Sequence, residues 1–399
     1  MVQVPALTVS GAAPAQSPGR TLLSYLVVPR PKDLVKAFVA PLVFAVGAAA
    51  QGGVSSSQMG RALLVWLALE LLVYPARYQW NDVRGFAADQ AHPDAASRGR
   101  LPGPPERGRR HQGASVAVAA LRMLLVLGLA LAVPAVAGVV LAMTVGVFAV
   151  AAVYETLRSA ATGRSDQVPV PLRPALVGLW VVVGAGYAVR GLTGLGLAVD
   201  LADRPGLVVA SVVTMWALGV VFVTCRWALE SMCFARFRDG RVHWEVGSGK
   251  AREHTVGLVR WLPTQAPRDA GVSPSRWQPL HGRTSPVAPW NLALVVAGGG
   301  AGLSGHLLSG GGGSPVALVA VAVGAATATV VSQLPRVRGL CALAGALLLL
   351  GLELVAGQDR APVAVLPLLI VFTAHRCFAR QRADEVGHPL RHLQRLLPG

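Results

Sequence analysis

Long apolar stretches constrain this chain more than any other feature of its sequence. The hydrocarbon core of a bilayer is about 30 Å thick, so a helix needs about 20 mostly apolar residues to cross it. Charged residues make up only 14% of the 399 residues, against about 25% in soluble domains. The apolar stretches cover approximately residues 37–51, 61–80, 114–132, 135–154, 175–197, 206–227, 288–309, 315–333, 338–356 and 361–379. The sequence therefore predicts an all-α fold, a polytopic membrane helical bundle. Its transmembrane helices number nine or ten, because the first stretch is short and only a few residues around Pro134 divide the third from the fourth.

The distribution of Lys and Arg predicts which side of the membrane each loop faces. Nearly all of these residues lie in every second loop and at the two ends of the chain, and the intervening loops contain only Arg204 and Arg360. Cytoplasmic loops of membrane proteins carry such an excess. We therefore expect an integral cell-membrane protein with both termini, and the long loops 82–113 and 228–287, in the cytoplasm. The net charge of +17 then reflects topology and contact with anionic membrane lipid, and no nucleic-acid partner is expected.

The regions outside the bundle have their own composition. Residues 1–30 are rich in Pro, Ser and Gly and predict a flexible cytoplasmic tail, residues 31–380 form the bundle, and residues 381–399 predict a basic cytoplasmic tail. The four cysteines show no C-x-x-C spacing, which favours buried thiols over a disulfide framework or a zinc site. The sequence does not indicate an oligomeric state.

The densest polar cluster is "QWNDVRGFAADQAHPDAASRGRLP", residues 79–102, directly after the second apolar stretch. If the helix continues through it, Asp82 and Asp89 lie two turns apart on one face, about 10 Å along the axis. Together with Asn81 they are oxygen ligands of the kind that Mg²⁺ prefers. The cluster therefore predicts a Mg²⁺ site at Asn81, Asp82 and Asp89, with the two aspartates catalytic.

Further side chains of the same cluster are suited to phosphate. Arg98 and Arg100 can bind phosphate oxygens through their guanidinium groups, and His92 follows Asp89 by about one turn. These three residues are predicted to bind substrate. The alternative interpretation is a solvated polar loop whose arginines follow the topology alone.

The cluster resembles the first aspartate-rich motif of the UbiA superfamily of intramembrane prenyltransferases, N-D-x-x-D-x-x-x-D followed by a stretch like R-P-L-P. The position of His92-Pro93 is most similar to the branch that makes polyprenyl-phosphate phosphoribose. Four more segments resemble family motifs and follow in the family's order, over about residues 29–240. They are "PRPKDLVKAFVAPLVFA" (29–45), similar to R-P-x-x-W-x-K; "YETLR" (154–158), similar to Y-x-x-x-K; "AGYAVRGLTG" (185–194), similar to G-Y-x-x-R-A-x-x-G; and, more loosely, "CRWALE" (225–230), similar to K-R-Y-A-E.

The resemblance implies a UbiA-like fold, Mg²⁺ as cofactor, and an isoprenoid diphosphate or a polyprenyl phosphate as substrate. It implies that Arg158 is a catalytic cation and that Tyr154 belongs to the substrate site. The chain also departs from the family pattern. Gly85 stands where the middle aspartate belongs, and loop 228–287 contains no second aspartate-rich motif. A single metal ion assisted by arginines remains compatible with these departures.

Charged residues inside apolar helices need partners, because each costs about 2.5–3.5 kcal/mol on insertion. Arg190 lies deepest, one turn after Tyr187, and two interpretations remain open for it. It either lines the substrate cavity, as a catalytic cation next to a substrate-binding Tyr187, or pairs with Glu70 as part of the fold. Arg77 lies one turn before Asn81 on the same face and is predicted to meet the motif or a phosphate.

Arg226 is a further phosphate candidate, although its spacing of four residues from Glu230 also allows a local ion pair.

The predicted activity is Mg²⁺-dependent transfer of a prenyl group from a prenyl diphosphate to a small or aromatic acceptor. The alternatives are phosphoribosyl transfer to a polyprenyl phosphate, membrane terpene cyclisation, and a degenerate member that serves as a non-catalytic membrane scaffold.

Overall fold

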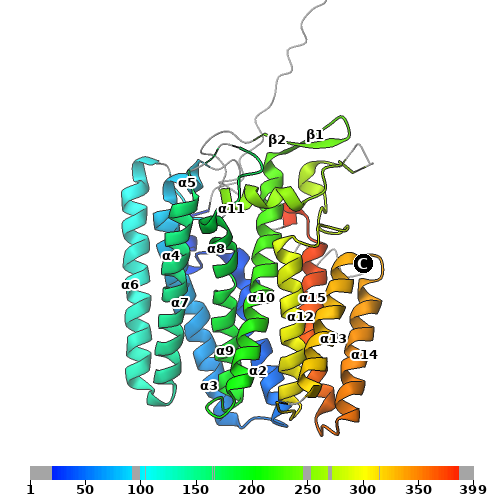
Figure 1. Ribbon diagram of the computed structural model, residues 1–399. Coiled ribbons are helices and arrows are strands. Elements are labelled where there is room, and N and C mark those ends of the chain that lie inside the picture. The colour runs from blue at the N-terminus through cyan, green and yellow to red at the C-terminus, as the bar shows by residue number, and fades with distance from the viewer. Residues whose placement is uncertain are drawn as a thin grey trace, which may run out of the picture.

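The computed structural model describes residues 20–91, 99–103, 105–163, 165, 167–245, 253–267, 272–313 and 315–385. Long helices run side by side, up and down through the molecule (Figure 1), which confirms the predicted all-α bundle. Within the described ranges, nine helices are long and apolar enough to cross a membrane. They are α3–α4 (Ser56–Arg84), α6 (Gly108–Ala132), α7 (Pro134–Ala161), α8–α9 (Pro174–Ala198), α10 with its 3₁₀ extension (Pro205–Phe234), α12 (Pro289–Leu308), α13 (Pro315–Gln333), α14 (Arg338–Val355) and α15 (Ala361–Ala379). The protein is thus a multi-pass membrane protein.

The first predicted stretch forms a shorter apolar helix. It consists of the 3₁₀ segment η1 (Pro31–Phe38) and α2 (Val39–Ala50), and its apolar part, Val35–Ala50, falls short of the nine spans. Residue 133 alone separates α6 from α7, because Pro134 opens the first turn of α7, a position where a missing N–H is tolerated.

The long loop predicted at 82–113 is more helical than expected. The first residues of the polar cluster belong to α4 (Tyr74–Arg84). After a turn at Gly85, a second short helix, α5 (Phe86–Gln90), follows. The last residues of this loop are helical as well, because α6 begins at Gly108. A Cβ atom at Gly108 would lie 2.8 Å from the ring of Phe86. The missing side chain therefore lets the start of α6 pack against α5.

The second long loop, 228–287, contains the only strands among the described residues. Strands β1 (Ala235–Arg238) and β2 (Arg241–Trp244) form an antiparallel hairpin, and Asp239 and Gly240 between them have positive φ angles of 51° and 70°. An Asp-Gly pair suits such a turn. Short helices α1 (Leu22–Val27) and α11 (Glu253–Val256) complete the segments outside the spans. The hairpin, α5 and α11 lie at the same end of the bundle, at the top of Figure 1, which we call the hairpin end.

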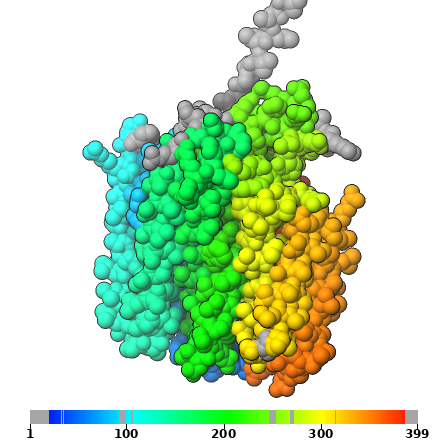
Figure 2. Space-filling model, viewed as in Figure 1, coloured from blue at the N-terminus to red at the C-terminus, as the bar shows by residue number. Residues whose placement is uncertain are grey.

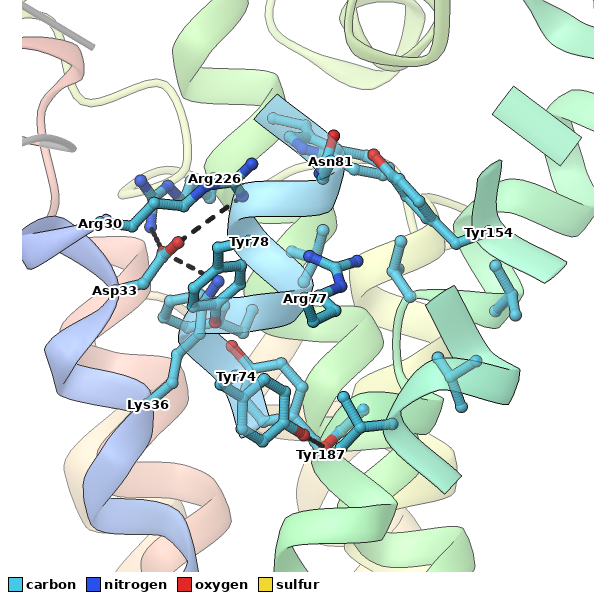
Figure 3. Close-up of a pocket in the computed structure, with 18 of the residues that line it drawn as sticks. Arg30, Asp33, Lys36, Tyr74, Arg77, Tyr78, Asn81, Tyr154, Tyr187 and Arg226 are labelled. Carbon is cyan, nitrogen blue, oxygen red and sulfur yellow. Dashed lines mark hydrogen bonds and ion pairs between the residues drawn. The ribbon is translucent and has the colours of Figure 1, made fainter. Parts of the chain in front are cut away.

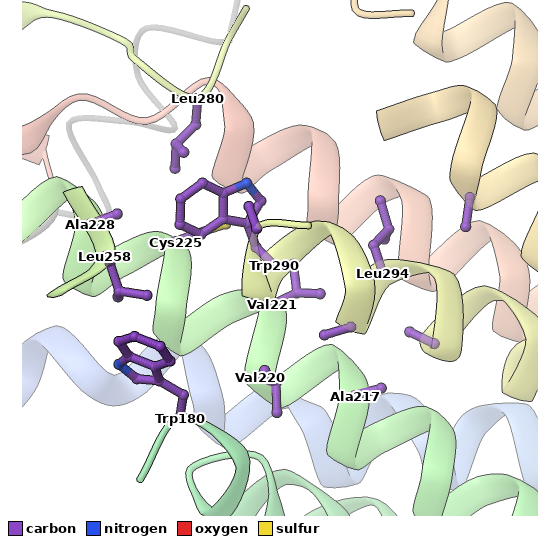
Figure 4. Close-up of a cluster of buried hydrophobic side chains, with 14 of the residues drawn as sticks. Trp180, Ala217, Val220, Val221, Cys225, Ala228, Leu258, Leu280, Trp290 and Leu294 are labelled. Atoms are coloured by element: carbon purple, nitrogen blue, oxygen red, sulfur yellow. The ribbon is translucent and has the colours of Figure 1, made fainter. Parts of the chain in front are cut away.

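Glycines allow three helices to approach closely. A Cβ atom at Gly302 of α12 would lie 2.1 Å from the carbonyl oxygen of Ala320 in α13, and one at Gly305 would lie 2.0 Å from that of Ala364 in α15. Small residues at such contacts are the usual basis of helix association in membranes. Large side chains fill the space beside α10 instead, where Trp180, Val221 and Trp290 pack in a buried cluster (Figure 4).

The outer helices expose apolar side chains. Leu131 on α6 and Leu348 on α14 are among many exposed leucines, and these helices form the two flanks of the block seen in Figure 2. An apolar exterior of this extent suits a hydrocarbon environment.

The α3–α4 span contains an irregular turn that positions the site. Residues Ala68–Val73 form a π-helical segment, η2, between α3 (Ser56–Leu67) and α4. Pro75 is the second residue of α4, and a proline inside a helix removes a backbone hydrogen bond and clashes with the preceding turn. The wider π turn relieves this conflict. It also carries Glu70.

Candidate functional site

A cavity lies toward the hairpin end between η1, α4, α7, α8–α9 and α10 (Figure 3). It contains about 1020 Å³ of space that no atom fills, including open solvent at its mouth. Its walls include valines of α7 and α8 and four tyrosines, and six cationic side chains face two acidic ones. The cations are Arg30, Lys36, Arg77, Arg100, Arg190 and Arg226, and the acids are Asp33 and Glu230. The lining therefore has an excess of four positive charges.

Asp33 holds three of the cations in place. Its carboxylate lies 2.9 Å from Lys36 Nζ, 2.9 Å from an Arg226 guanidinium nitrogen and 3.9 Å from Arg30, as the dashed lines of Figure 3 show. Burial raises the pKa of Asp33, but the charges of Lys36, Arg226 and Arg30 outweigh it and hold the pKa well below its usual value. Glu230 adds a second contact, 3.2 Å from Arg226. Both acids thus orient cations toward the cavity.

Arg190 has the position that each of its two interpretations requires, and its catalytic role stays a prediction. It lines the cavity, and its guanidinium group also donates hydrogen bonds of 2.8 and 3.2 Å to the two carboxylate oxygens of Glu70. The same group stacks on the ring of Tyr74, whose hydroxyl donates a hydrogen bond to the carbonyl oxygen of Gly186. The deep end of the cavity is therefore a closed network in which the charge of Arg190 is already balanced.

Two donors of the cavity are without a polar partner. Arg77 lies between Tyr78 and Tyr154 (Figure 3), with its guanidinium carbon 5.4 and 5.5 Å from their ring centres. Within the described part of the chain it forms no ion pair or hydrogen bond. The hydroxyl of Tyr187 is buried and likewise unbonded among the described residues. Both groups line the cavity and are available to a ligand.

The aspartates of the polar cluster lie behind the cavity and do not line it. Asp82 is completely buried, and its carboxylate binds Arg30, lies 3.1 Å from Arg100 and accepts a 3.3 Å hydrogen bond from Tyr25. Asp89 is buried on α5, beyond the interruption at Gly85. The alignment of the two aspartates was expected for a helix that continues; a turn at Gly85 separates α4 from α5, and the alignment stays a prediction.

In this arrangement the cluster does not fit a magnesium ion. Both oxygens of Asp82 are occupied by donors, and the side-chain oxygen of Asn81 accepts a 2.9 Å hydrogen bond from Arg158. Within the described residues, no three His, Cys, Asp or Glu side chains lie close enough to hold a metal ion. A magnesium ion would have to displace at least two arginines, and the Mg²⁺ site stays a prediction.

The remaining predicted residues divide into three groups. Arg158 does not line the cavity; it joins Asn81 to Glu155, whose carboxylate lies 2.6 Å from it. His92 and Arg98 lie outside the described residues. The cavity lining brings together seven of the predicted site residues: Arg77, Asn81, Arg100, Tyr154, Tyr187, Arg190 and Arg226.

Among the lining residues that were not predicted as site residues are Arg30, Asp33 and Lys36. They belong to "PRPKDLVK", residues 29–36, which was noted only for its resemblance to a family motif. The sequence does contain a signal for this segment, because four charged residues lie within seven positions immediately before an apolar helix.

The chain was compared with protein-family models, with curated proteins and with solved structures, and none of the three comparisons gives a match.

Proposed function

We propose that the protein is an intramembrane transferase of the UbiA type, which moves an isoprenoid group from its diphosphate to a small or aromatic acceptor. The observation that carries the proposal is the cavity lining, in which six cationic and two acidic side chains lie beside apolar walls. A diphosphate matches the charge, and an isoprenoid chain matches the walls. Segments that resemble the superfamily supply five of the six cations: Arg30, Lys36, Arg100, Arg190 and Arg226.

In the proposed reaction, the bond between C1 of the isoprenoid and the bridging oxygen breaks, and the diphosphate leaves with the electron pair. Arg77 and Tyr187 donate hydrogen bonds to its oxygens, and the cations held by Asp33 offset the charge that develops on them. The acceptor then forms a bond to C1 and loses its proton to water at the mouth. Apolar walls keep water away from the allylic cation. No step is assigned to Mg²⁺, since Asp82 is held by two arginines.

A second candidate is phosphoribosyl transfer to a polyprenyl phosphate. The spacing of His92-Pro93 in the polar cluster favours it. So does the excess of four positive charges, because this reaction brings two anionic substrates into the same cavity.

Isolated membranes that contain the protein provide the test. They are incubated with radiolabelled geranylgeranyl diphosphate plus an aromatic acceptor, or with labelled phosphoribosyl diphosphate plus polyprenyl phosphate, each with Mg²⁺ and with a chelator. Labelled prenylated acceptor supports the lead proposal, and labelled lipid in the second incubation supports phosphoribosyl transfer. Labelled hydrocarbon identifies a cyclase. Saturable binding without turnover identifies a scaffold, and the absence of both binding and turnover refutes the cavity as an isoprenoid phosphate site.

We also propose that the hairpin end and both termini face the cytoplasm, because the loops assigned to that side contain nearly all the Lys and Arg outside the spans. In a cysteine-free background, R276C would carry the only thiol at the hairpin end, and S57C the only thiol at the opposite end. Both positions are exposed. A membrane-impermeant thiol reagent applied to whole cells should label S57C and not R276C; the reverse pattern would invert the orientation.

A further inference from the structure

A second group of cations lies apart from the cavity, between the α13–α14 connection and the end of α15. Arg336, Arg338, Arg376 and Arg380 line a recess together with His281. The recess contains about 860 Å³ of empty space, including open solvent. None of the described residues that line it is acidic, and none of them also lines the cavity.

The arginines of the recess differ in their hydrogen bonds to the rest of the protein. Arg338 donates hydrogen bonds of 3.1 and 3.2 Å to the carbonyl oxygens of Val331 and Gly282, so it stabilises the fold. Arg336 and Arg376 are exposed, and within the described ranges neither forms an ion pair or a hydrogen bond. The guanidinium group of Arg376 lies beside the start of α14, where a Cβ atom on Gly339 would be 3.0 Å from one of its nitrogens.

The backbone adds to the positive field of the recess. Helix α14 begins at Arg338, and Gly339 and Leu340 of its first turn line the recess. The first N–H groups of a helix lack acceptors within the helix and carry partial positive charge. Burial, followed by the positive charges of Arg338 and Arg380, lowers the pKa of His281.

The surface beside the recess is apolar. Leu340 is 69% exposed and lies at the rim. Leu343 follows Leu340 by three residues, and Leu347 follows Leu343 by four, which places all three on one face of α14. Leu343 and Leu347 are exposed as well. A ligand with a phosphate group and hydrocarbon chains would therefore contact both surfaces at once.

We propose that this recess binds the phosphate group of an anionic membrane lipid, whose acyl chains lie along the exposed leucines of α14. Arginine guanidinium groups bind phosphate oxygens in pairs, and basic pockets between membrane helices bind anionic headgroups. The inference does not depend on the reaction proposed for the cavity.

Native mass spectrometry of the purified, delipidated full-length protein tests the proposal. The protein is titrated with phosphatidylglycerol, with phosphatidylcholine and, in a separate arm, with inorganic phosphate. The variant R336Q/R376Q removes the two unpaired guanidinium groups and leaves the backbone contacts of Arg338 intact. The matched control R109Q/R110Q removes two exposed arginines from the first turn of α6. The melting temperature of each variant is measured to show that it is folded.

We expect one phosphatidylglycerol to bind preferentially, and R336Q/R376Q to weaken its affinity about 30-fold, roughly fivefold for each arginine near a lipid surface. The control variant should bind as the wild type does. An equal loss in both variants would overturn the proposal, because it would show a general attraction to positive charge. Binding of inorganic phosphate that displaces the lipid would also overturn it, since the ligand would then be a soluble phosphate.

Discussion

Replacing Arg77 by Gln removes one positive charge from the cavity and leaves the helix that carries it intact. Arg77 contacts the rings of Tyr78 and Tyr154 at 5.4 and 5.5 Å and forms no ion pair among the described residues. Where water has access, each such contact contributes about 0.5–1 kcal/mol. We therefore expect R77Q to lower the free energy of unfolding by only about 1–2 kcal/mol.

The effect of R77Q on ligand binding should be larger. A hydrogen bond to a charged group contributes about 1.5–3 kcal/mol, which corresponds to an affinity for a diphosphate about 10- to 150-fold weaker. The assay is saturable binding of radiolabelled geranylgeranyl diphosphate to purified protein in nanodiscs. Unfolding is followed in parallel by titration with a denaturing detergent.

Two further variants separate binding from folding. R77K keeps the charge and should bind within about tenfold of the wild type, because it loses only the second guanidinium contact. R190Q leaves Glu70 buried without its partner and should cost about 3–5 kcal/mol of stability. Arg77 is assigned to binding of the diphosphate, and the pair of Arg190 with Glu70 to stability of the fold. Both assignments are wrong if R77Q binds the diphosphate as tightly as the wild type and R190Q remains fully stable.

Three other predictions concern the surroundings of the cavity. D82N leaves two arginines without their shared anion, and we expect a loss of about 3–5 kcal/mol in unfolding free energy; a fully stable D82N that loses only Mg²⁺-dependent turnover would instead identify Asp82 as a metal ligand. G302V forces a side chain against the carbonyl oxygen of Ala320 and should destabilise the protein by about 1–3 kcal/mol, whereas G351V, whose Cβ meets no neighbour, should not; equal melting temperatures would argue against the close contact of α12 and α13. The three cationic neighbours of Asp33 hold its folded-state pKa below the unfolded value of about 3.9. Its ion pairs therefore contribute their full stability above that unfolded value, and the contribution is lost as the pH falls through the lower folded pKa. Burial lowers the pKa of the partner Lys36 to about 8, so the test is confined to the acid side of neutrality. There the stability difference between wild type and D33N should stay constant down to about pH 5 and shrink only in stronger acid, and a loss of the difference before about pH 5 would contradict this.

The sequence predicts local features of this protein well. Apolar length alone places the helices, because each must satisfy its backbone hydrogen bonds inside the bilayer. The pair of Arg226 and Glu230 follows from their spacing on one helix, and it forms at 3.2 Å. The partnership of Arg190 with Glu70 was foreseeable as one of two alternatives, since both residues lie at similar depth in apolar segments.

Contacts between distant segments could not be predicted in this way. Asp82 was expected to face a metal ion, but Arg30, 52 residues earlier, folds back onto it. Arg226 binds Asp33, 193 residues away, and nothing in the spacing of either motif indicates this pair. Such contacts depend on how the helices pack, and the same charges that suit a phosphate are equally suited to a neighbouring carboxylate.

The π-helical segment Ala68–Val73 determines which side chains of α4 line the cavity. A turn that holds one extra residue rotates everything after it by about 100° relative to an uninterrupted α-helix. Deleting a single residue there would turn Arg77 and Asn81 away from the cavity without altering their identity. In a chain of this architecture, the lining of a cavity can therefore change through the length of one helical turn while every charged residue keeps its identity.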